Sequence, residues 1–457
     1  MKRSLPVFFF VLLSLSAGAQ WDDTDRLSND FHRARREALR TLMPEKSAAV
    51  FFSNPVRNRN NDVDFQFSQN PDFYYLSGYT EPNAVIILFK EARVFDGIQT
   101  NELIFVQDRN PKQEIWNGKR LGVEGTRQML GFPAVYRGID LKGFGINWSA
   151  LKEVLIVLPD QPNRERDNPA DLSDLVDFLK EGLSASPDLY QNHTALPKLM
   201  ARLREKKEPG ELKLLQKAMD ITIDGFKDMI RQLSPGMTEY QAQAIVEYHA
   251  KKGGSEYMGY PSICGGGLNA CVLHYTFNRK KLKGEELILV DMGAEYHGYT
   301  ADITRTLPVD GKYSEEEKAI YNLVLAAQDS GISKCKAGNA FRASHEAAYE
   351  VIAEGLLKLG LINSASEAGR YFMHGTSHFL GLDVHDAGTY GPLQAGVVMT
   401  VEPGIYIPEG SPCDRKWWGI GIRIEDDILV TDAVPVNMTA ALPRTIAELE
   451  KLMAEDF

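Results

Sequence analysis

Two aspartates on either side of a turn-forming segment are the first residues whose type and spacing suggest chemistry. Residues 284–306 (GEELILVDMGAEYHGYTADITRT) contain an apolar run that predicts a buried strand, followed by a polar turn and a second strand. If Tyr296 and His297 form the loop of a tight hairpin, Asp291 faces Asp302 across the pair. Like charges directly opposite each other are destabilising, so these carboxylates indicate a divalent cation with oxygen ligands between them. A solvated turn is the alternative that this segment leaves open.

Three of the nine histidines lie in one short window, residues 373–386 (MHGTSHFLGLDVHD), and are interleaved with glycine and large apolar residues. A lone histidine is usually a hydrogen-bonded core or surface residue, but three so close together favour a site. Two apolar runs follow, and each carries a carboxylate: Glu402 ends the run VVMTVEPG, and Glu425 lies in GIRIEDDI. A buried carboxylate is costly without a cation or a hydrogen-bond donor.

Together these segments supply four carboxylates and one imidazole, which match the needs of a hydrolytic site with two metal ions. Two divalent ions about 3.5–4 Å apart can share a bridging water, lower its pKa and stabilise both the attacking and the departing group. Oxygen-dominated ligation without thiolates favours Mn²⁺, Co²⁺ or Fe²⁺ over a structural zinc site. The predicted ligands are Asp291, Asp302, His378, Glu402 and Glu425.

Two domains are expected to position these residues. Residues 20–204 predict an α/β domain, because short β-type runs alternate with turn-formers and residues 170–183 repeat apolar residues at helical spacing. Pro209, with acids in the first turn, predicts the start of a helix, and Thr238-x-x-Gln241 is a capping box for the next one. We place the boundary near residue 205, so the catalytic domain covers residues 205–457, with helices in two pairs around strands rich in acids and histidine.

The composition is that of a soluble globular protein. The chain has 457 residues, of which 44% are apolar and 25% charged, and this length has room for two or three domains. The net charge of −11 opposes binding to nucleic acid. Four cysteines are too few for a disulfide scaffold, and no Cys-x-x-Cys pair suggests a thiolate metal site.

Residues 1–19 predict a cleavable signal peptide. Lys2 and Arg3 form a short basic region, an apolar core too short to span a bilayer follows, and Ala17-Gly18-Ala19 resembles a cleavage site. We therefore expect an exported protein, located in the periplasm of a host with two membranes, and without a membrane anchor.

Four motifs give the sequence a resemblance to a known family. In this order, VDMGAEYHGYTADITRT, HGTSHFLGLDVHD, TVEPGIYI and GIRIEDD resemble the aminopeptidase P (Xaa-Pro aminopeptidase) branch of the pita-bread metallopeptidases. Residues 57–90 resemble the N-terminal domain of that family. The resemblance implies an α/β N-terminal domain followed by an α+β pita-bread catalytic domain, in which a curved antiparallel sheet is covered by two helix pairs.

The resemblance also implies a role for each ligand. Asp291 would chelate one ion, and Asp302 and Glu425 would bridge both. His378 and Glu402 would complete the coordination of the second ion, and Glu402 would also accept a proton from the bridging water. The implied cofactors are two divalent ions, with Mn²⁺ as the first choice.

Seven further residues match positions on the substrate side: His274, His374, His385, Tyr260, Arg423, Asp62 and Trp116. The three histidines can donate hydrogen bonds to the carbonyl oxygen as it becomes an oxyanion. In the family the N-terminal domain of a neighbouring subunit can reach the site, which is where Asp62 and Trp116 would act in a homodimer or homotetramer. The local motif EIWNGKR departs slightly from the family pattern but keeps Trp116.

The implied activity is hydrolysis of the bond between an N-terminal residue and a following proline. An X–Pro bond lacks an N–H and its ring fixes φ, so peptidases that bind that N–H cannot process it, whereas a metal site attacks the carbonyl directly. A prolidase, which cleaves X-Pro dipeptides, shares the pattern HG-x-x-HFLG-x-DVHD and is the main alternative. A non-catalytic peptide-binding module on the same fold would usually lack ligands, and none is missing here.

Overall fold

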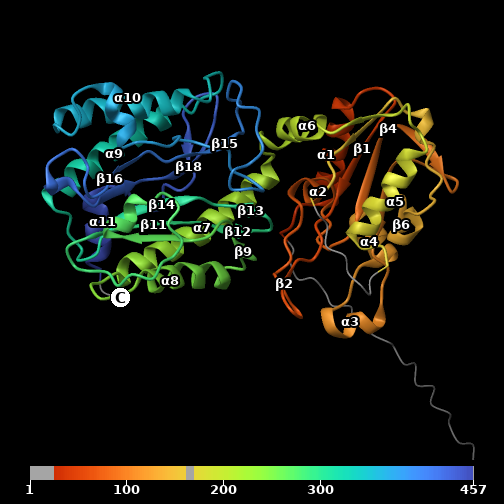
Figure 1. Cartoon of the computed structure of the whole chain (residues 1–457), viewed down its shortest axis with the longest axis horizontal. Coiled ribbons are helices and arrows are strands. Elements are labelled where there is room, and N and C mark those ends of the chain that lie inside the picture. The colour runs from red at the N-terminus through yellow and green to blue at the C-terminus, as the bar shows by residue number, and fades with distance from the viewer. Residues whose placement is uncertain (1–24, 161–168, 456–457) are drawn as a thin grey trace, which may run out of the picture.

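The chain forms two bodies that are joined through a short linker (Figure 1). The computed structural model describes residues 25–160 and 169–455; the predicted signal peptide, residues 1–19, lies outside them. Helix α6 (Ala195–Arg204) belongs to the end of the first body, and α7 (Pro209–Gln232) begins the second. The predicted boundary near residue 205 stays a prediction.

The N-terminal body is a mixed sheet with helices around it. Its strand order is β6-β5-β4-β1-β7-β8, antiparallel across β5-β4-β1 and parallel at both ends. Every residue of β1 is buried, as expected for a strand that is covered on both faces. The strands are β1 (Ser47–Phe52), β4 (Val85–Phe95), β5 (Ile98–Val106), β6 (Val135–Arg137), β7 (Glu153–Ile156), β8 (Tyr190–Asn192) and the separate hairpin β2 (Asn58–Asn60) and β3 (Val63–Asp64). The helices before α6 are α1 (Asn29–Leu42), α2 (Pro71–Ser77), α3 (Pro111–Asn117), α4 (Gly122–Leu130) and α5 (Leu172–Ser184).

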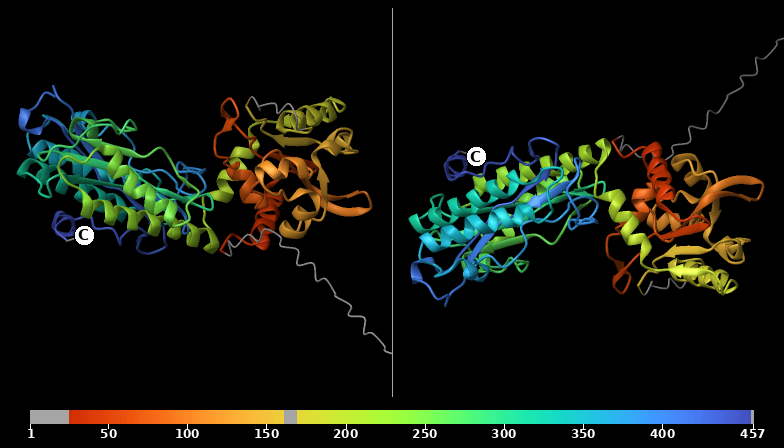
Figure 2. Two further views of the ribbon diagram at one scale, coloured as in Figure 1. Left: turned by 90° about the horizontal axis from the view of Figure 1, so that it is seen from below. Right: turned by 90° about the horizontal axis from the view of Figure 1, so that it is seen from above.

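The second body places short antiparallel strands between two helix pairs. Figure 2 shows α7 and α8 over the strands from below, and α9 and α10 over them from above. The helices after α7 are α8 (Glu239–Lys252), α9 (Glu315–Ser333), α10 (Ala343–Lys358) and α11 (Ile446–Met453). The strands are β9 (Tyr257–Met258), β10 (Ile263–Gly266), β11 (Leu287–Met292), β12 (Ala294–Tyr296), β13 (Tyr299–Thr300), β14 (Ile303–Pro308), β15 (Val398–Val401), β16 (Gly404–Ile407), β17 (Ile420–Arg423), β18 (Asp426–Leu429) and β19 (Val436–Asn437). The predicted fold class, an α/β domain followed by an α+β domain with two helix pairs, is confirmed.

The helix starts in the second body follow the local sequence signals. Pro209 is the first residue of α7, where its missing N–H costs nothing. Thr238 and Gln241 form the predicted capping box of α8, and the Gln241 side chain accepts the Thr238 N–H at 2.8 Å. Both helices then bury apolar residues against the strands.

The central hairpin exists, but its predicted register is wrong. The two-residue loop is His297-Gly298 rather than Tyr296-His297, and Asp291 pairs with Thr304 rather than with Asp302. The reason is the turn: both loop residues have positive φ, 49° and 85°, as a type I′ hairpin requires, and glycine adopts this conformation at little cost. The error shifts each partner by two residues, and because side chains alternate with a period of two, Asp291 and Asp302 still project to the same side.

A close backbone approach at Gly293 predicts a measurable stability cost. A Cβ added there would overlap the Ala301 carbonyl oxygen, which is backbone and cannot move aside. Gly293→Ala should therefore lower the free energy of unfolding by at least about 1–3 kcal/mol, the usual cost of overpacking. The matched control is Gly145→Ala, where an added Cβ meets nothing within 4 Å. Equal urea midpoints for the two variants would contradict the prediction.

Candidate metal centre

Backbone hydrogen bonds place Asp302 and Glu425 next to each other. Glu425 lies between β17 and β18, and its N–H donates to the Thr304 carbonyl oxygen at 3.1 Å. The Thr304 hydroxyl in turn donates to the Glu425 carboxylate at 2.6 Å. Asp302 directly precedes β14, and its N–H donates to Oδ2 of Asp427 at 3.1 Å. The two predicted bridging carboxylates therefore project from adjacent backbones.

The segment that carries the three clustered histidines lies along β15. Thr400 of β15 donates its N–H to the His378 carbonyl oxygen at 3.0 Å and accepts the His378 N–H on its hydroxyl at 3.2 Å. Glu402, which follows β15, donates its N–H to the Thr376 carbonyl oxygen at 2.8 Å. His378 and Glu402 therefore also start from neighbouring backbones.

The side chains of all five predicted ligands meet in one place. The Tyr260 hydroxyl lies 2.6 Å from Asp291 Oδ1 and 2.5 Å from Asp302 Oδ1. Nε2 of His378 lies 3.3 Å from Asp302 Oδ2 and 3.5 Å from Glu402 Oε1. One ligand atom each of Asp302, His378 and Glu425 lies within 4.8 Å of the other two. We call Asp291, Asp302, His378, Glu402 and Glu425 the ligand cluster.

The ligand cluster concentrates negative charge away from water. Burial raises the pKa of Glu425 well above its ordinary value, and the nearby Asp302, Glu402 and Asp291 raise it further. Burial likewise raises the pKa of Asp302, although His378 works against this shift. Carboxylates that oppose one another in a dry site need cations to become ionised together. The donor set of four carboxylates and one imidazole therefore fits divalent ions that prefer oxygen and imidazole, and these five residues would hold them.

Arg423 and Tyr406 complete one wall of the site. The Arg423 guanidinium lies 2.5 Å from Asp291 Oδ2 and donates to the Tyr406 hydroxyl at 2.9 Å. Nε2 of His374 lies 2.9 Å from the same hydroxyl, and its Nδ1 lies 3.8 Å from Glu402 Oε2. The predicted substrate-side residues Tyr260, Arg423 and His374 are thus in direct contact with the ligand cluster.

The three predicted substrate-side histidines differ in exposure. Burial lowers the pKa of His374 to about 4, and the charge of Arg423 acts in the same direction, so its ring is neutral near pH 7. His385 keeps more than a third of its surface exposed, and its ring centroid lies 4.2 Å from that of His378. The partial burial of its ring and the nearby His378 lower its pKa. His274 is also exposed, and it lowers the pKa of both other rings, which places it on the same side.

Asp62 and Trp116 are not part of this arrangement within one chain. Asp62 lies in the turn between β2 and β3, and Trp116 in α3, both in the N-terminal body of Figure 1. Trp116 is 87% exposed. In the described part of the chain no hydrogen bond or ion pair joins either residue to the ligand cluster. Their action from a neighbouring subunit stays a prediction.

Three residues in the site were not predicted: Thr304, Tyr406 and Asp427. Asp427 was detectable in principle, because it lies two residues after Glu425 in extended chain and so faces the same side. Its Oδ1 is buried and has no hydrogen-bond partner among the described residues. Tyr406 lies in the motif TVEPGIYI, but nothing in its local sequence distinguishes it from an ordinary core tyrosine.

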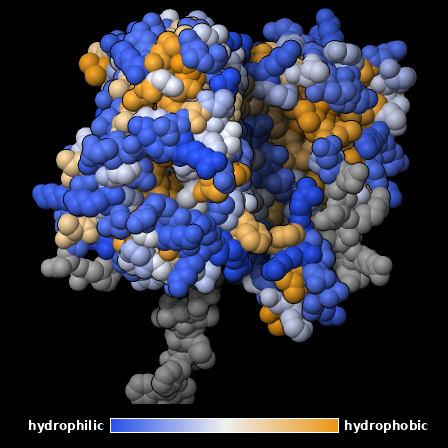
Figure 3. Space-filling view, turned by 60° about the vertical axis from the view of Figure 1, so that its left-hand side comes forward, coloured by the Kyte–Doolittle hydropathy of each residue, from blue (hydrophilic) through white to orange (hydrophobic). Residues whose placement is uncertain are grey.

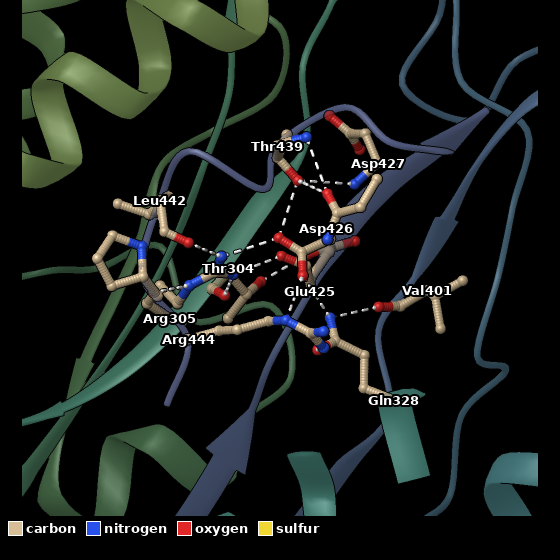
Figure 4. Close-up of polar contacts among 12 residues, drawn as sticks. Thr304, Arg305, Gln328, Val401, Glu425, Asp426, Asp427, Thr439, Leu442 and Arg444 are labelled. Atoms are coloured by element: carbon tan, nitrogen blue, oxygen red, sulfur yellow. Dashed lines mark hydrogen bonds and ion pairs between the residues drawn. The ribbon is translucent and has the colours of Figure 1, made fainter. Parts of the chain in front are cut away.

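A buried arginine supports the predicted bridging ligand from behind. Arg305 is fully buried and forms an ion pair with Asp426 at 2.8 Å. Figure 4 shows Arg305 among Thr304, Glu425 and Asp426. Arg305 also donates to the Thr304 and Glu425 carbonyl oxygens, at 2.9 Å and 2.7 Å. One guanidinium therefore joins the backbone next to Asp302 to the backbone of Glu425.

A cavity of about 640 Å³ between the two bodies borders the site. Figure 3 shows the surface hollowed between them. The second body contributes Thr300, Leu382 and His385 to the wall, and the N-terminal body contributes Phe67 and Tyr74. A peptide chain that extends past the ligand cluster therefore has space to continue along this side.

The metal-free protein should lose stability as the pH rises. Burial, partly offset by His378 and Arg423, raises the pKa of Glu402 from 4.5 to about 7. The folded state then holds a proton that the unfolded chain releases, so this contribution to stability is present below pH 4.5 and is lost as the pH rises through about 7. Burial lowers the pKa of His378, but Asp302 and Glu402 outweigh it and raise the pKa from 6.5 to about 9, which gives the same sign.

Divalent ions should reverse this trend, because ligands must be deprotonated to bind. The increase in Tm on saturation with Mn²⁺ should grow between about pH 5 and about pH 8, as linkage requires. Asp302→Ala, which lacks one predicted bridge, should show little increase at either pH. Differential scanning calorimetry with and without metal checks this, and an increase that does not depend on pH would refute it.

Comparisons with known proteins agree with the geometry. The profile of "Metallopeptidase family M24" matches residues 213–432, and that of "Aminopeptidase P, N-terminal domain" matches residues 32–144. None of the helices within residues 25–160 and 169–455 combines the length and the apolar character that a membrane span requires.

Similar proteins extend this match over nearly the whole chain. The Xaa-Pro aminopeptidase of Haemophilus influenzae is 34% identical over 440 residues, which is 94% of this chain and 98% of that protein. The Xaa-Pro aminopeptidase of Escherichia coli is 33% identical over 439 residues, 93% and 98% of the two chains. The solved structure of Pseudomonas aeruginosa aminopeptidase PepP superposes with a TM-score of 0.84 at 34% identity, covering 94% of this chain and 98% of the other. The chain therefore belongs to the aminopeptidase P family of metallopeptidases.

Proposed function

We propose that the protein is a metal-dependent Xaa-Pro aminopeptidase, which hydrolyses the bond between an N-terminal residue and a following proline. The observation that carries the proposal is the convergence of four carboxylates and one imidazole beside the three substrate-side histidines. Relatives with this activity in their names cover almost the whole chain.

Two divalent ions held by the ligand cluster would supply Lewis acidity and an activated water. The chain's own residues perform the remaining tasks. The Glu402 carboxylate lies 3.5 Å from His378 Nε2 and 3.8 Å from His374 Nδ1, and it would accept a proton from the water and return it to the departing nitrogen.

His374 is neutral near pH 7, and its one N–H is at Nδ1, which donates to the Gly375 carbonyl oxygen at 2.7 Å, so Nε2 accepts the Tyr406 hydroxyl at 2.9 Å. Arg423 holds Asp291 in place, at 2.5 Å.

The substrate class follows from the same residues. A proline ring needs a small pocket and offers no N–H, and the rings of His374 and Tyr406 and the exposed ring of His385 can form part of such a wall. The free amino terminus of the substrate is a cation, which the carboxylates of the ligand cluster attract. The cavity between the two bodies leaves space for residues beyond proline, which supports peptides longer than two residues as substrates.

The metal-loaded protein should release the first residue from an X-Pro-Y tripeptide. Amino-acid analysis of a reaction with the tripeptide, and of a parallel reaction with the X-Pro dipeptide, provides the measurement. Cleavage of the dipeptide alone would overturn the proposal in favour of a prolidase. Release from neither peptide, with no transition metal bound after reconstitution, would favour a non-catalytic binding module.

We further propose Mn²⁺ as the ion, because oxygen ligands dominate the cluster and thiolates are missing from it. Activity after reconstitution of the metal-free protein with Mn²⁺, Co²⁺, Fe²⁺ and Zn²⁺ tests this choice.

Export to the periplasm and assembly into a homodimer or homotetramer are also proposals. Residues 1–19 support the first, and the exposed Trp116 supports the second. N-terminal sequencing of the mature protein and sedimentation velocity test them.

A further inference from the structure

A buried ion network joins the N-terminal body, the linker and the loop that carries His385. Arg204, the last residue of α6, forms ion pairs at 2.7 Å with Asp72 of α2 and at 2.7 Å with Asp383. It also pairs with Asp386. The Lys207 ammonium lies 2.7 Å from the other Asp386 oxygen and donates to the Arg204 carbonyl oxygen at 2.7 Å.

The network is hidden from water. The side chains of Lys207 and Asp386 are each 1% exposed, and that of Arg204 is 5% exposed. Burial alone would raise the pKa of Asp386, but Lys207 and Arg204 outweigh it and hold the pKa below its ordinary value. Buried ion pairs of this kind add little net stability compared with apolar residues of the same size. The network is therefore better explained by the backbone segments that it holds in place than by the stability that it adds.

The ion pairs hold the backbone on both sides of His385. Asp383 and Asp386 lie on either side of it in the chain, and Arg204 holds both. The loop closes on itself through the Asp386 N–H, which donates to the Phe379 carbonyl oxygen at 2.8 Å, directly after the ligand His378.

The same loop is tied to the central hairpin and leaves room for the ion pairs. The Thr300 N–H donates to the Gly381 carbonyl oxygen at 2.9 Å. A side chain at Gly381 would collide with the Asp386 carboxylate, so a glycine is required for the network to form. The backbone around His385 is thus held by hydrogen bonds and by charges at both ends.

We propose that Arg204, Lys207 and Asp386 are positioning residues, which hold the His385 ring in its orientation toward the substrate. Through the ion pair with Asp72, the position of His385 also depends on the contact between the two bodies. This inference rests on the proposed function and extends it. A displacement of about 1 Å at a substrate-positioning group can cost about 100-fold in rate. Loss of the contacts that fix His385 should therefore lower the rate of hydrolysis.

The chain offers a matched control in the N-terminal body. Glu102 accepts from Arg36 at 2.9 Å and from Arg40 at 3.2 Å, and its side chain is 6% exposed. It is therefore also a buried carboxylate between two cations, but among the described residues no hydrogen bond or ion pair joins it to the ligand cluster or to the loop that carries His385. Glu102→Gln reproduces the stability cost of breaking such a network without touching His385.

The first test compares Asp386→Asn with Glu102→Gln in the metal-loaded full chain. Both variants should lose thermal stability and retain bound metal. Glu102→Gln should keep kcat for the tripeptide within about twofold, whereas Asp386→Asn should lower kcat by about 10–100-fold. Because Asp386→Asn leaves a buried cation short of a partner, a gentler variant is included: Asp72→Asn, whose side chain is 29% exposed, should lower kcat about fivefold.

A double-mutant cycle with His385→Ala separates positioning from a general structural effect. If Asp386 and Asp72 act through His385, their substitutions should change kcat less than about twofold in the His385→Ala background. Additive losses would overturn the proposal, and so would equal losses of kcat in Asp386→Asn and Glu102→Gln.

A readout without catalysis distinguishes failure of this inference from failure of the proposed function. In the Zn²⁺-loaded full chain, Asp386→Asn should shift or broaden the imidazole NMR signals of His385, identified by their loss in His385→Ala. The signals of His249, which pairs with Asp228, should stay in place. Unchanged His385 signals would refute positioning. Shifted signals in a protein that cleaves no X-Pro peptide would refute the proposed activity and leave the positioning role standing.

Discussion

Repulsion among buried carboxylates is the constraint on which the catalytic body depends. Asp291, Asp302, Glu402 and Glu425 lie close together, burial raises the pKa of the last three, and the charge of Asp291 raises all three further. Arg423 neutralises part of this charge through Asp291, and His378 shares its proton between two acids. Full ionisation of these carboxylates at neutral pH requires further positive charge, because most of their surface is buried. Metal binding and the stability of this body are therefore linked, because ions that bind the folded cluster stabilise it by mass action.

The architecture prepares this cluster by fixing backbones rather than single side chains. The ligands start from the ends of short strands whose partners are distant in sequence, such as Glu425 opposite Thr304. Arg305 holds that pair together (Figure 4), since it donates to both carbonyl oxygens and forms an ion pair with Asp426. Because the backbone fixes where each ligand begins, the distances between the ligands change little when no metal is bound. This is what preorganisation of a metal site requires.

The sequence was sufficient to predict the fold class and the five residues of the ligand cluster. Asp291 and Asp302 were expected on one side of a hairpin, and they lie there although the loop is His297-Gly298, because a two-residue error keeps the parity of a strand. The register itself was missed because turn geometry, with positive φ at both loop residues, decides it. Tyr406 and Thr304 could not be found, since their roles depend on pairings between segments that no local pattern encodes.

The charged linker gives the sharpest contrast between sequence and structure. Residues 204–207 read as REKK, a typical solvated segment, yet Arg204 and Lys207 are buried against acids far along the chain. A charged segment at a domain boundary is normally kept in water, because burying each ion costs several kcal/mol. That cost is offset here only because Asp72, Asp383 and Asp386 come from both bodies at once. The arrangement is therefore complete only when the N-terminal body is docked, so both bodies of a single chain hold the loop that carries His385.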